Sequence, residues 1–294
     1  SIFKKFNNKS NLELINLTKK LEASFGFKLN VRSIVRNIYF PQFFLNKVAN
    51  LIVSNTSPRL MGLLNDGSSK FFLKTGRDYR IPLIEFQHGD ASNLDMVSSY
   101  PKKIEGEYWI PDKIFLYGNY WKERYNLESQ KIVIGNPVFD IFNKKYRNIK
   151  AKSNNVLCIS VNSVSFARFV FEASKKDYST KFYFKLRESE YDNWAINYPF
   201  LLNTKNFTII NNNHKHLYDL IGESSYIIST ISTVIYESLS LKTNVIIIIN
   251  NDFPYIEELE KRGLIKTAET TDELINLINL DPDELKIDEN LFYK

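Results

Sequence analysis

Apolar and polar positions alternate along this chain in a way that predicts an α/β protein. Short apolar runs between turn residues are typical of buried strands, and apolar residues spaced three or four apart are typical of helices. The expected strands are residues 51–53, 81–86, 113–117, 131–134, 156–161, 181–186, 207–210, 226–229, 245–249 and 264–266, and 70–78 is a strand or a turn. The expected helices are residues 12–25, 119–125, 166–175, 234–241, 252–262 and 271–280.

Residues 143–155 interrupt this pattern because they are polar, basic and without an apolar run. We expect a linker there, between an N-terminal domain at 1–142 and a C-terminal domain at 156–294. Alternating strands and helices in both parts favour two Rossmann-like domains. Two such domains facing each other across a cleft can hold two substrates away from water.

A Ser- and Thr-rich segment stands where one predicted helix begins. It contains Ser229, Thr230, Ser232 and Thr233. The first turn of a helix has unpaired N–H groups that attract anions, and small hydroxyl residues leave the approach open. Glu237 follows one turn later, where a carboxylate can accept hydrogen bonds from the two hydroxyls of a ribose. The segment is therefore a candidate nucleotide site, although the same residues can serve only to cap a helix.

A second candidate site lies at the end of the predicted strand 81–86. Ligands of open parallel sheets collect beyond the carboxyl ends of the strands. Gln87, His88, Gly89 and Asp90 would lie at that edge. Gly89 permits a tight turn and a close approach by a substrate, and histidine is well suited to accept a proton near neutral pH. The alternative is a turn histidine that is hydrogen-bonded to a backbone carbonyl.

In the order of four motifs, this chain resembles bacterial glycosyltransferases of the GT-B fold that build capsule and lipopolysaccharide. The motifs are QHG at 87–89, PDKIFLYGNYWKERY at 111–125, IGNPVFD at 134–140 and STISTVIYESLS at 229–240. Sialyltransferases and Kdo transferases that use CMP-sugars belong to this group. CDP-glycerol phosphotransferases are similar around the His-Gly pair. The resemblance spans residues 51–278 and implies a fold and a reaction class.

The resemblance also implies roles for individual residues. His88 or Asp90 would be the general base, and Gln87 and Gly89 would lie on the acceptor side. The family often has a Lys-x-His-Pro segment in the C-terminal domain, where this chain has Lys185 and Arg187 without the His-Pro. These two basic residues can neutralise a phosphate or carboxylate, or can form a solvated strand end. The implied donor-binding residues are Lys185, Arg187, Ser229, Thr230, Ser232, Thr233 and Glu237.

Composition is that of an ordinary globular protein and excludes some classes. The chain has 294 residues, of which 44% are hydrophobic and 24% are charged. Neither Gly-x-Gly-x-x-Gly nor Gly-x-x-x-x-Gly-Lys-Ser/Thr occurs, which argues against dinucleotide oxidoreductases and P-loop phosphotransferases. The single cysteine, Cys158, excludes an intramolecular disulfide and indicates a reducing compartment.

Charge and hydropathy predict a cytoplasmic protein. The sequence has no apolar run of transmembrane length and no secretory signal, and it begins with Ser rather than Met, which suggests a fragment. The net charge is +6, with basic and aromatic residues mixed in the first forty or so positions. Peripheral contact with the inner face of the plasma membrane is one interpretation of those positions, and burial in the domain core is the other. Without a recognisable binding motif, no nucleic-acid partner is expected.

The sequence lacks an Asp-x-Asp motif at a strand end, since its one match, Asp281-Pro-Asp283, is expected to cap a helix. We therefore expect no metal or other cofactor. The predicted function is transfer of a sugar from a CMP- or UDP-linked donor to a glycan or lipid-linked glycan by direct displacement. The alternatives are a CDP-glycerol or ribitol phosphotransferase, a non-catalytic partner protein and a UDP-sugar epimerase.

Overall fold

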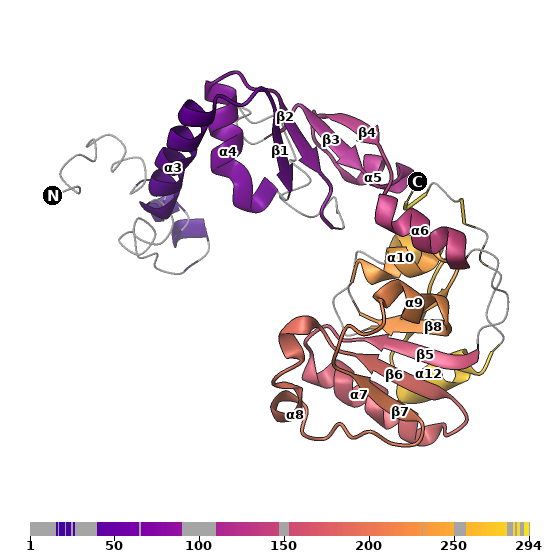
Figure 1. Cartoon of the computed structure of the whole chain (residues 1–294). Helices are drawn as coiled ribbons and strands as arrows, with labels where there is room; N and C mark the ends of the chain where they lie inside the picture. Colours follow the sequence, from indigo (N-terminus) through magenta and orange to yellow (C-terminus); the bar gives the residue numbers. More distant parts are fainter. Residues whose placement is uncertain are drawn as a thin grey trace. The chain divides into compact units, whose positions relative to one another are not determined.

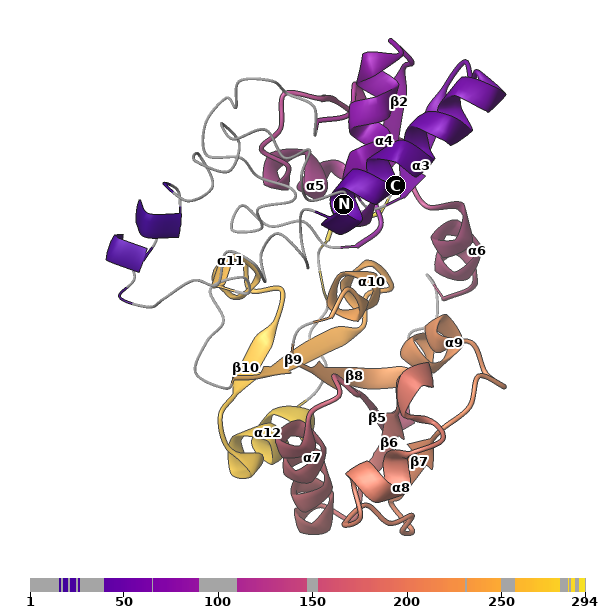
Figure 2. The same ribbon diagram turned by 90° about the vertical axis from the view of Figure 1, so that its left-hand side faces the viewer.

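The structure is a computed structural model, and its two views show helices packed beside strands (Figures 1 and 2). It describes residues 16, 18–20, 22–24, 26, 40–64, 66–89, 110–146, 153–230, 232–249, 257–280, 285, 287–288 and 291–293. The chain divides into two compact units, one formed by 1–86 and 103–113, and the other by 87–102 and 114–294.

A four-stranded sheet has the order β1-β2-β3-β4, and β1 pairs with β2 in parallel. Its strands are β1 (Met61–Leu64), β2 (Leu83–Phe86), β3 (Lys113–Leu116) and β4 (Gln130–Val133). In the first unit, α4 (Asp66–Asp78) packs on β1 and β2, where Leu63, Leu73 and Leu83 form a small buried cluster. The other long helix of this unit, α3 (Phe40–Thr56), packs against α4.

The second unit contains a six-stranded parallel sheet of order β10-β9-β8-β5-β6-β7. Alternate residues of its central strands enter two separate cores, as a doubly wound sheet requires. One core lies with α7 (Val164–Lys176) and α12 (Thr271–Ile278), and the other with α9 (Leu217–Gly222) and α10 (Val234–Ser240). The strands are β5 (Ser153–Ile159), β6 (Lys181–Lys185), β7 (Phe207–Ile210), β8 (Ser224–Ser229), β9 (Asn244–Ile248) and β10 (Lys266–Ala268).

Helices connect the strands of the second unit. The Thr270 hydroxyl accepts from the Glu273 N–H and the Glu273 carboxylate reaches back to the Thr270 backbone, so a capping box begins α12. The helices are α5 (Asn119–Arg124), α6 (Pro137–Tyr146), α7 (Val164–Lys176), η3 (Glu188–Glu190), α8 (Trp194–Asn197), α9 (Leu217–Gly222), α10 (Val234–Ser240), α11 (Glu257–Lys261) and α12 (Thr271–Ile278).

Most predicted elements are confirmed, with two errors in the first unit. The expected strand at 51–53 lies inside α3, and 70–78 lies inside α4 rather than in a strand or turn. In both places a short apolar run is one part of a longer helix, which three or four residues cannot reveal. Strand β1, helices α6 and α8 and the short helix η3 were not predicted.

The linker prediction covers residues that the structure describes only in part. Helix α6 continues to Tyr146, β5 begins at Ser153, and 147–152 lie outside the described residues, as do Asp281 and Asp283. The boundaries of the two predicted domains stay a prediction. Within the described part of the chain, the helices are too short or too polar to cross a bilayer.

Candidate functional site

The hydroxyl-rich turn between β8 and α10 lies at the carboxyl edge of the six-stranded sheet. Ser229 ends β8 and is fully buried, and its Oγ has no hydrogen-bond partner among the described residues. The Ser232 Oγ accepts from the Val234 N–H at 3.3 Å, whereas Thr233, the residue before the helix, makes no capping bond with its side chain. Within the described structure, the Ser232 and Thr233 N–H groups find no acceptor, so the turn presents unused donors.

Glu237 lies on α10 in a setting that disfavours its charge. Burial raises the pKa of its carboxyl to about 7, and a hydrogen bond from the Tyr218 hydroxyl opposes only part of this shift. The charge of Glu237 in turn contributes to the raised pKa of Tyr117, Tyr218 and Tyr293, after burial as the first cause for each of them. A carboxyl that is half neutral near pH 7 can accept or donate a hydrogen bond to a ligand.

The three tyrosines come from distant segments of the second unit. Tyr117 follows β3, Tyr218 lies in α9, and Tyr293 belongs to the C-terminal segment 291–293. The Tyr117 and Tyr293 rings stack with centroids 5.4 Å apart. The Trp121 indole N–H donates to the Phe292 carbonyl at 2.8 Å and holds this segment against α5. Sequence analysis did not find this cluster, because nothing in the spacing of the tyrosines marks them as neighbours.

The turn after β2 is held by Gln87. Its Oε1 accepts from the Tyr117 N–H at 2.9 Å and its Nε2 donates to the Gly89 carbonyl at 2.8 Å, while its side chain is 1% exposed. Both polar atoms of the Gln87 side-chain amide therefore bond to backbone groups. His88 is exposed and forms no hydrogen bond with any described residue, so the alternative of a carbonyl-bonded turn histidine finds no support there. Asp90 lies outside the described residues.

The two candidate motifs meet at Gly89 and Thr233. A Cβ placed on Gly89 would lie 3.9 Å from the Thr233 Cγ2, in ordinary contact. Both residues belong to the second unit. The structure thus brings the His88 turn beside the hydroxyl-rich turn that leads to Glu237.

Lys185 and Arg187 lie at the end of β6, on the same edge of the sheet. Lys185 is buried, and its Nζ donates to the Asn212 carbonyl at 2.9 Å, to the Asn213 Oδ1 at 3.0 Å and to the Tyr191 hydroxyl. It is therefore not a solvated strand end. Arg187 is exposed, and its Nε donates to the Ser160 carbonyl at 3.1 Å. Ser160 follows β5, the strand between β6 and β8, so Arg187 reaches toward the hydroxyl-rich turn.

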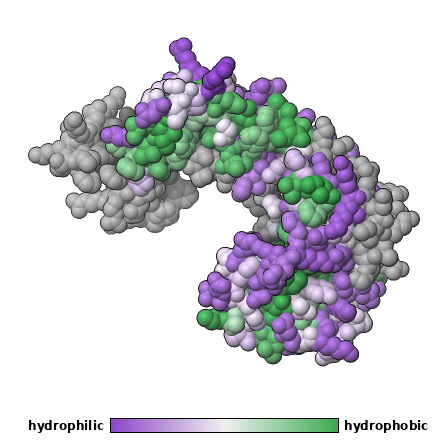
Figure 3. Space-filling model, in the orientation of Figure 1, coloured by the Kyte–Doolittle hydropathy of each residue, from purple (hydrophilic) through white to green (hydrophobic). Residues whose placement is uncertain are grey.

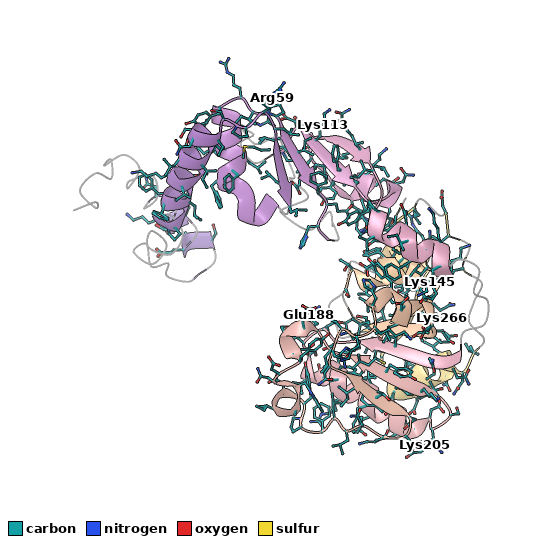
Figure 4. All side chains as sticks on the ribbon, viewed as in Figure 1. Arg59, Lys113, Lys145, Glu188, Lys205 and Lys266 are labelled. Carbon is teal, nitrogen blue, oxygen red and sulfur yellow. The ribbon has the colours of Figure 1, made fainter. Side chains whose placement is uncertain are left out.

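A buried carboxylate fixes the turn that carries Arg187. Glu190 is 1% exposed, and its oxygens accept from the Ser160 hydroxyl at 2.8 Å, the Arg187 N–H at 2.8 Å and the Tyr198 hydroxyl. Burial and the neighbouring carboxylate raise the pKa of Tyr198 to about 12. The neighbouring Glu188, labelled in Figure 4, accepts from the Asn213 amide. Sequence analysis missed this network, whose one sequence signal is an acid three residues after Arg187.

A metal site is not evident in the part of the chain that the structure describes. Its His, Cys, Asp and Glu side chains nowhere gather in groups of three or more. His214 and His216 are both exposed, and the His216 Nδ1 accepts from the Tyr218 N–H at 3.2 Å.

Comparison with known proteins gives matches in structure alone. No family model and no curated protein matches the sequence. Among solved structures, UDP-GlcNAc 2-epimerase of Methanocaldococcus jannaschii, in complex with UDP-GlcNAc and UDP, has a TM-score of 0.56 and 14% identity, over 86% of this chain and 77% of the other. MurG of Acinetobacter baumannii has a TM-score of 0.53 and 12% identity, over 81% and 69%. The glycotransferase of kitacinnamycin has a TM-score of 0.56 and 10% identity, over 81% and 71%.

This chain has the GT-B fold. The predicted fold class of two α/β domains with Rossmann-like parallel sheets is therefore confirmed. At 10% to 15% identity these neighbours establish the fold alone, and they include both a glycotransferase and epimerases.

Proposed function

We propose that this protein is a glycosyltransferase that moves a sugar from a CMP- or UDP-linked donor to a bacterial surface-glycan acceptor. The observation that carries the proposal is the closeness of Gly89 to Thr233, whose Cγ2 would lie 3.9 Å from a Cβ added at the glycine. It supports the proposal because His88, which is exposed, precedes Gly89, and Thr233 precedes the helix that carries Glu237. A proton acceptor next to a nucleotide-binding edge is the arrangement that group transfer requires.

The donor would bind along the carboxyl edge of the six-stranded sheet. Glu237 would accept hydrogen bonds from the ribose hydroxyls in its ionised form. The N–H groups of Ser232 and Thr233 and the buried Ser229 hydroxyl would donate to phosphate oxygens, together with the hydroxyl of Thr230 and the free nitrogens of the Arg187 guanidinium. Lys185 would position the loop after β6 rather than contact the donor, because its ammonium already holds the ends of β6 and β7 together.

The reaction would be a direct displacement. His88, or Asp90 as its rival, takes the proton of an acceptor hydroxyl while that oxygen forms a bond to the anomeric carbon. The bond from the anomeric carbon to the phosphate oxygen breaks, and its electron pair leaves with the nucleotide. Arg187 and the turn before α10 offset the developing charge. Since the sequence has no Asp-x-Asp at a strand end, we propose that transfer needs no divalent metal.

Epimerisation of a UDP-sugar is the second candidate, and the epimerases among the solved structures favour it. The two activities differ in what they need. An epimerase converts UDP-GlcNAc without an acceptor, whereas a transferase requires one. A CDP-glycerol or ribitol phosphotransferase would instead be recognised by the mass of its product.

The test is a thermal-shift panel with CMP, CDP, UDP, GDP, CMP-sialic acid, CMP-Kdo and UDP-GlcNAc, each with and without EDTA, followed by mass analysis of products. We expect a selective shift that EDTA does not change, because a ligand that binds only the folded state raises its stability. Conversion of UDP-GlcNAc without acceptor would assign the epimerase. A shift from no nucleotide would overturn the proposal in favour of a non-catalytic partner protein.

A further inference from the structure

Glu190 is a buried carboxylate in the short helix η3, which follows β6. It is 1% exposed, although Arg187, Glu188 and Ser189 before it are all exposed. In the view that Figures 3 and 4 share, the surface of the second unit around the labelled Glu188 is largely hydrophilic. Burial of a carboxylate is costly unless hydrogen bonds replace those it makes with water. The partners of Glu190 therefore indicate what this acid is for.

Glu190 closes a ring of hydrogen bonds with Ser160 and Arg187. The Ser160 hydroxyl donates to one carboxylate oxygen at 2.8 Å, and the Arg187 backbone N–H donates to the other at 2.8 Å. The Arg187 Nε completes the ring by donating to the Ser160 carbonyl at 3.1 Å. The Tyr198 hydroxyl also donates to Glu190 from outside the ring. The backbone and the side chain of Arg187 are thus both tied to one carboxylate, directly or through Ser160.

The ring leaves two nitrogens of the Arg187 guanidinium for a ligand. Among the described residues, no acceptor bonds to its Nη1 or Nη2, and the residue is exposed. These nitrogens form a planar fork that matches the oxygens of a phosphate or a carboxylate. Cys158 on β5 is opposite Ile228 on β8, so Ser160 lies about level with Thr230. Neighbouring strands are about 4.8 Å apart, so the ring lies close to the hydroxyl-rich turn.

We propose that Glu190 is a positioning residue for donor binding, which holds Arg187 where its guanidinium meets an anionic group of the donor. This inference rests on the proposed function, which places the donor at this edge of the sheet. The alternative is a purely structural role, in which Glu190 only joins η3 and α8 to the sheet. Since a nucleotide is an anion, loss of a nearby carboxylate should by itself strengthen nucleotide binding. Weaker binding would therefore report a lost geometry, and its dependence on Arg187 would identify that geometry.

The test is calorimetric titration of the full chain with UDP, CDP and CMP. Arg187→Ala should weaken the affinity for nucleotide at least about tenfold, because it removes hydrogen bonds from a charged group. Glu190→Ala should weaken it about fivefold in the wild-type background and less than about twofold in the Arg187→Ala background. This coupling would identify Arg187 as the residue through which Glu190 acts.

Glu190→Gln is the conservative variant that should restore binding. Its amide oxygen can accept from the Arg187 N–H, and its NH₂ group can donate to the Ser160 and Tyr198 hydroxyls, which rotate to accept. It should therefore bind nucleotide at least as tightly as the wild type does. Glu188→Ala is the matched control, because Glu188 is an exposed acid of the same short helix and lies outside the ring. It should also bind at least as tightly.

Circular dichroism should show that each variant folds. If Glu190→Ala does not fold, Ser160→Ala opens the same ring by removing one hydroxyl. That variant should weaken binding about threefold with Arg187 present and not at all in the Arg187→Ala background. Equal losses in the two backgrounds, an equal loss in Glu188→Ala, or no loss in Arg187→Ala would overturn the inference alone. A wild-type chain that binds none of the three nucleotides would overturn the proposed function as well.

Discussion

Gly89 and Thr233 lie so close that one added carbon on the glycine would touch the threonine, at 3.9 Å from the Thr233 Cγ2. Gly89→Ala should therefore be tolerated, with stability and turnover near those of the wild type. Gly89→Leu should fill the space beside the turn and lower turnover at least about tenfold, with unfolding little changed. Steady-state kinetics of the two variants checks this. Equal activity would show that no substrate approaches Gly89.

Glu237→Gln should weaken nucleotide binding by about tenfold to a hundredfold, since hydrogen bonds to a charged group are worth about 1.5–3 kcal/mol. The pKa of about 7 makes this effect depend on pH. In the wild type, nucleotide affinity should rise as pH increases through about 7, because the ionised carboxyl is the form that accepts from ribose. In Glu237→Gln this rise should be absent. Calorimetric titration with UDP or CDP at several pH values measures both effects, and the same pH dependence in the variant would exclude Glu237 as the ribose contact.

Glu237 should also affect stability with a definite sign. Its pKa is raised in the folded state, so the folded protein holds a proton that the unfolded chain releases between about 4.5 and about 7. The contribution of Glu237 to the free energy of unfolding is fully present below about pH 4.5 and is lost as pH rises through about 7. Relative to Glu237→Gln, the free energy of unfolding of the wild type should fall by up to about 3 kcal/mol over this interval. Urea unfolding at matched pH values tests this, and parallel curves for the two proteins would contradict it.

His88→Ala should lower kcat by about a hundredfold or more and leave nucleotide affinity unchanged, because the imidazole is exposed and acts only on the acceptor proton. His214→Ala is the control, since His214 is also exposed but lies on the loop after β7. Retention of turnover in His88→Ala would transfer the role of base to Asp90. Loss of nucleotide binding in the same variant would mean that His88 belongs to the donor site.

Gly118→Ala should destabilise the second unit by about 1–3 kcal/mol. A Cβ at Gly118 would lie 2.6 Å from the Leu291 carbonyl oxygen, so the backbone of segment 291–293 would have to move. Gly62→Ala is the control, because its Cβ would meet the Phe86 ring at 3.4 Å. Urea unfolding and nucleotide binding together check the prediction. Equal stability of the two variants would show that segment 291–293 does not pack against Gly118.

The sequence predicts local features of this protein, and it does not predict features that depend on contacts between residues far apart in the chain. Apolar runs located the central strands β8 and β9 of the second unit, since these strands are buried on both faces and need no partner to be recognised. The same criterion failed at 51–53 and 70–78, where apolar residues belong to helices α3 and α4. At the candidate site, the hydroxyls before α10 and the turn after β2 were found because each is local. The Tyr117 and Tyr293 stack beside Glu237 and the bonds from Ser160 and Tyr198 to Glu190 were not found, because tertiary packing alone brings these residues together.

The segment 291–293 has a consequence for how the site forms during synthesis. A ribosome releases Glu237 well before Tyr293, and until Tyr293 reaches Tyr117 the carboxyl lacks one wall of its surroundings. In that interval Glu237 should titrate more like a carboxyl in water. The nascent second unit can pair its strands early, whereas the surroundings of Glu237 are complete only after Phe292 docks on Trp121.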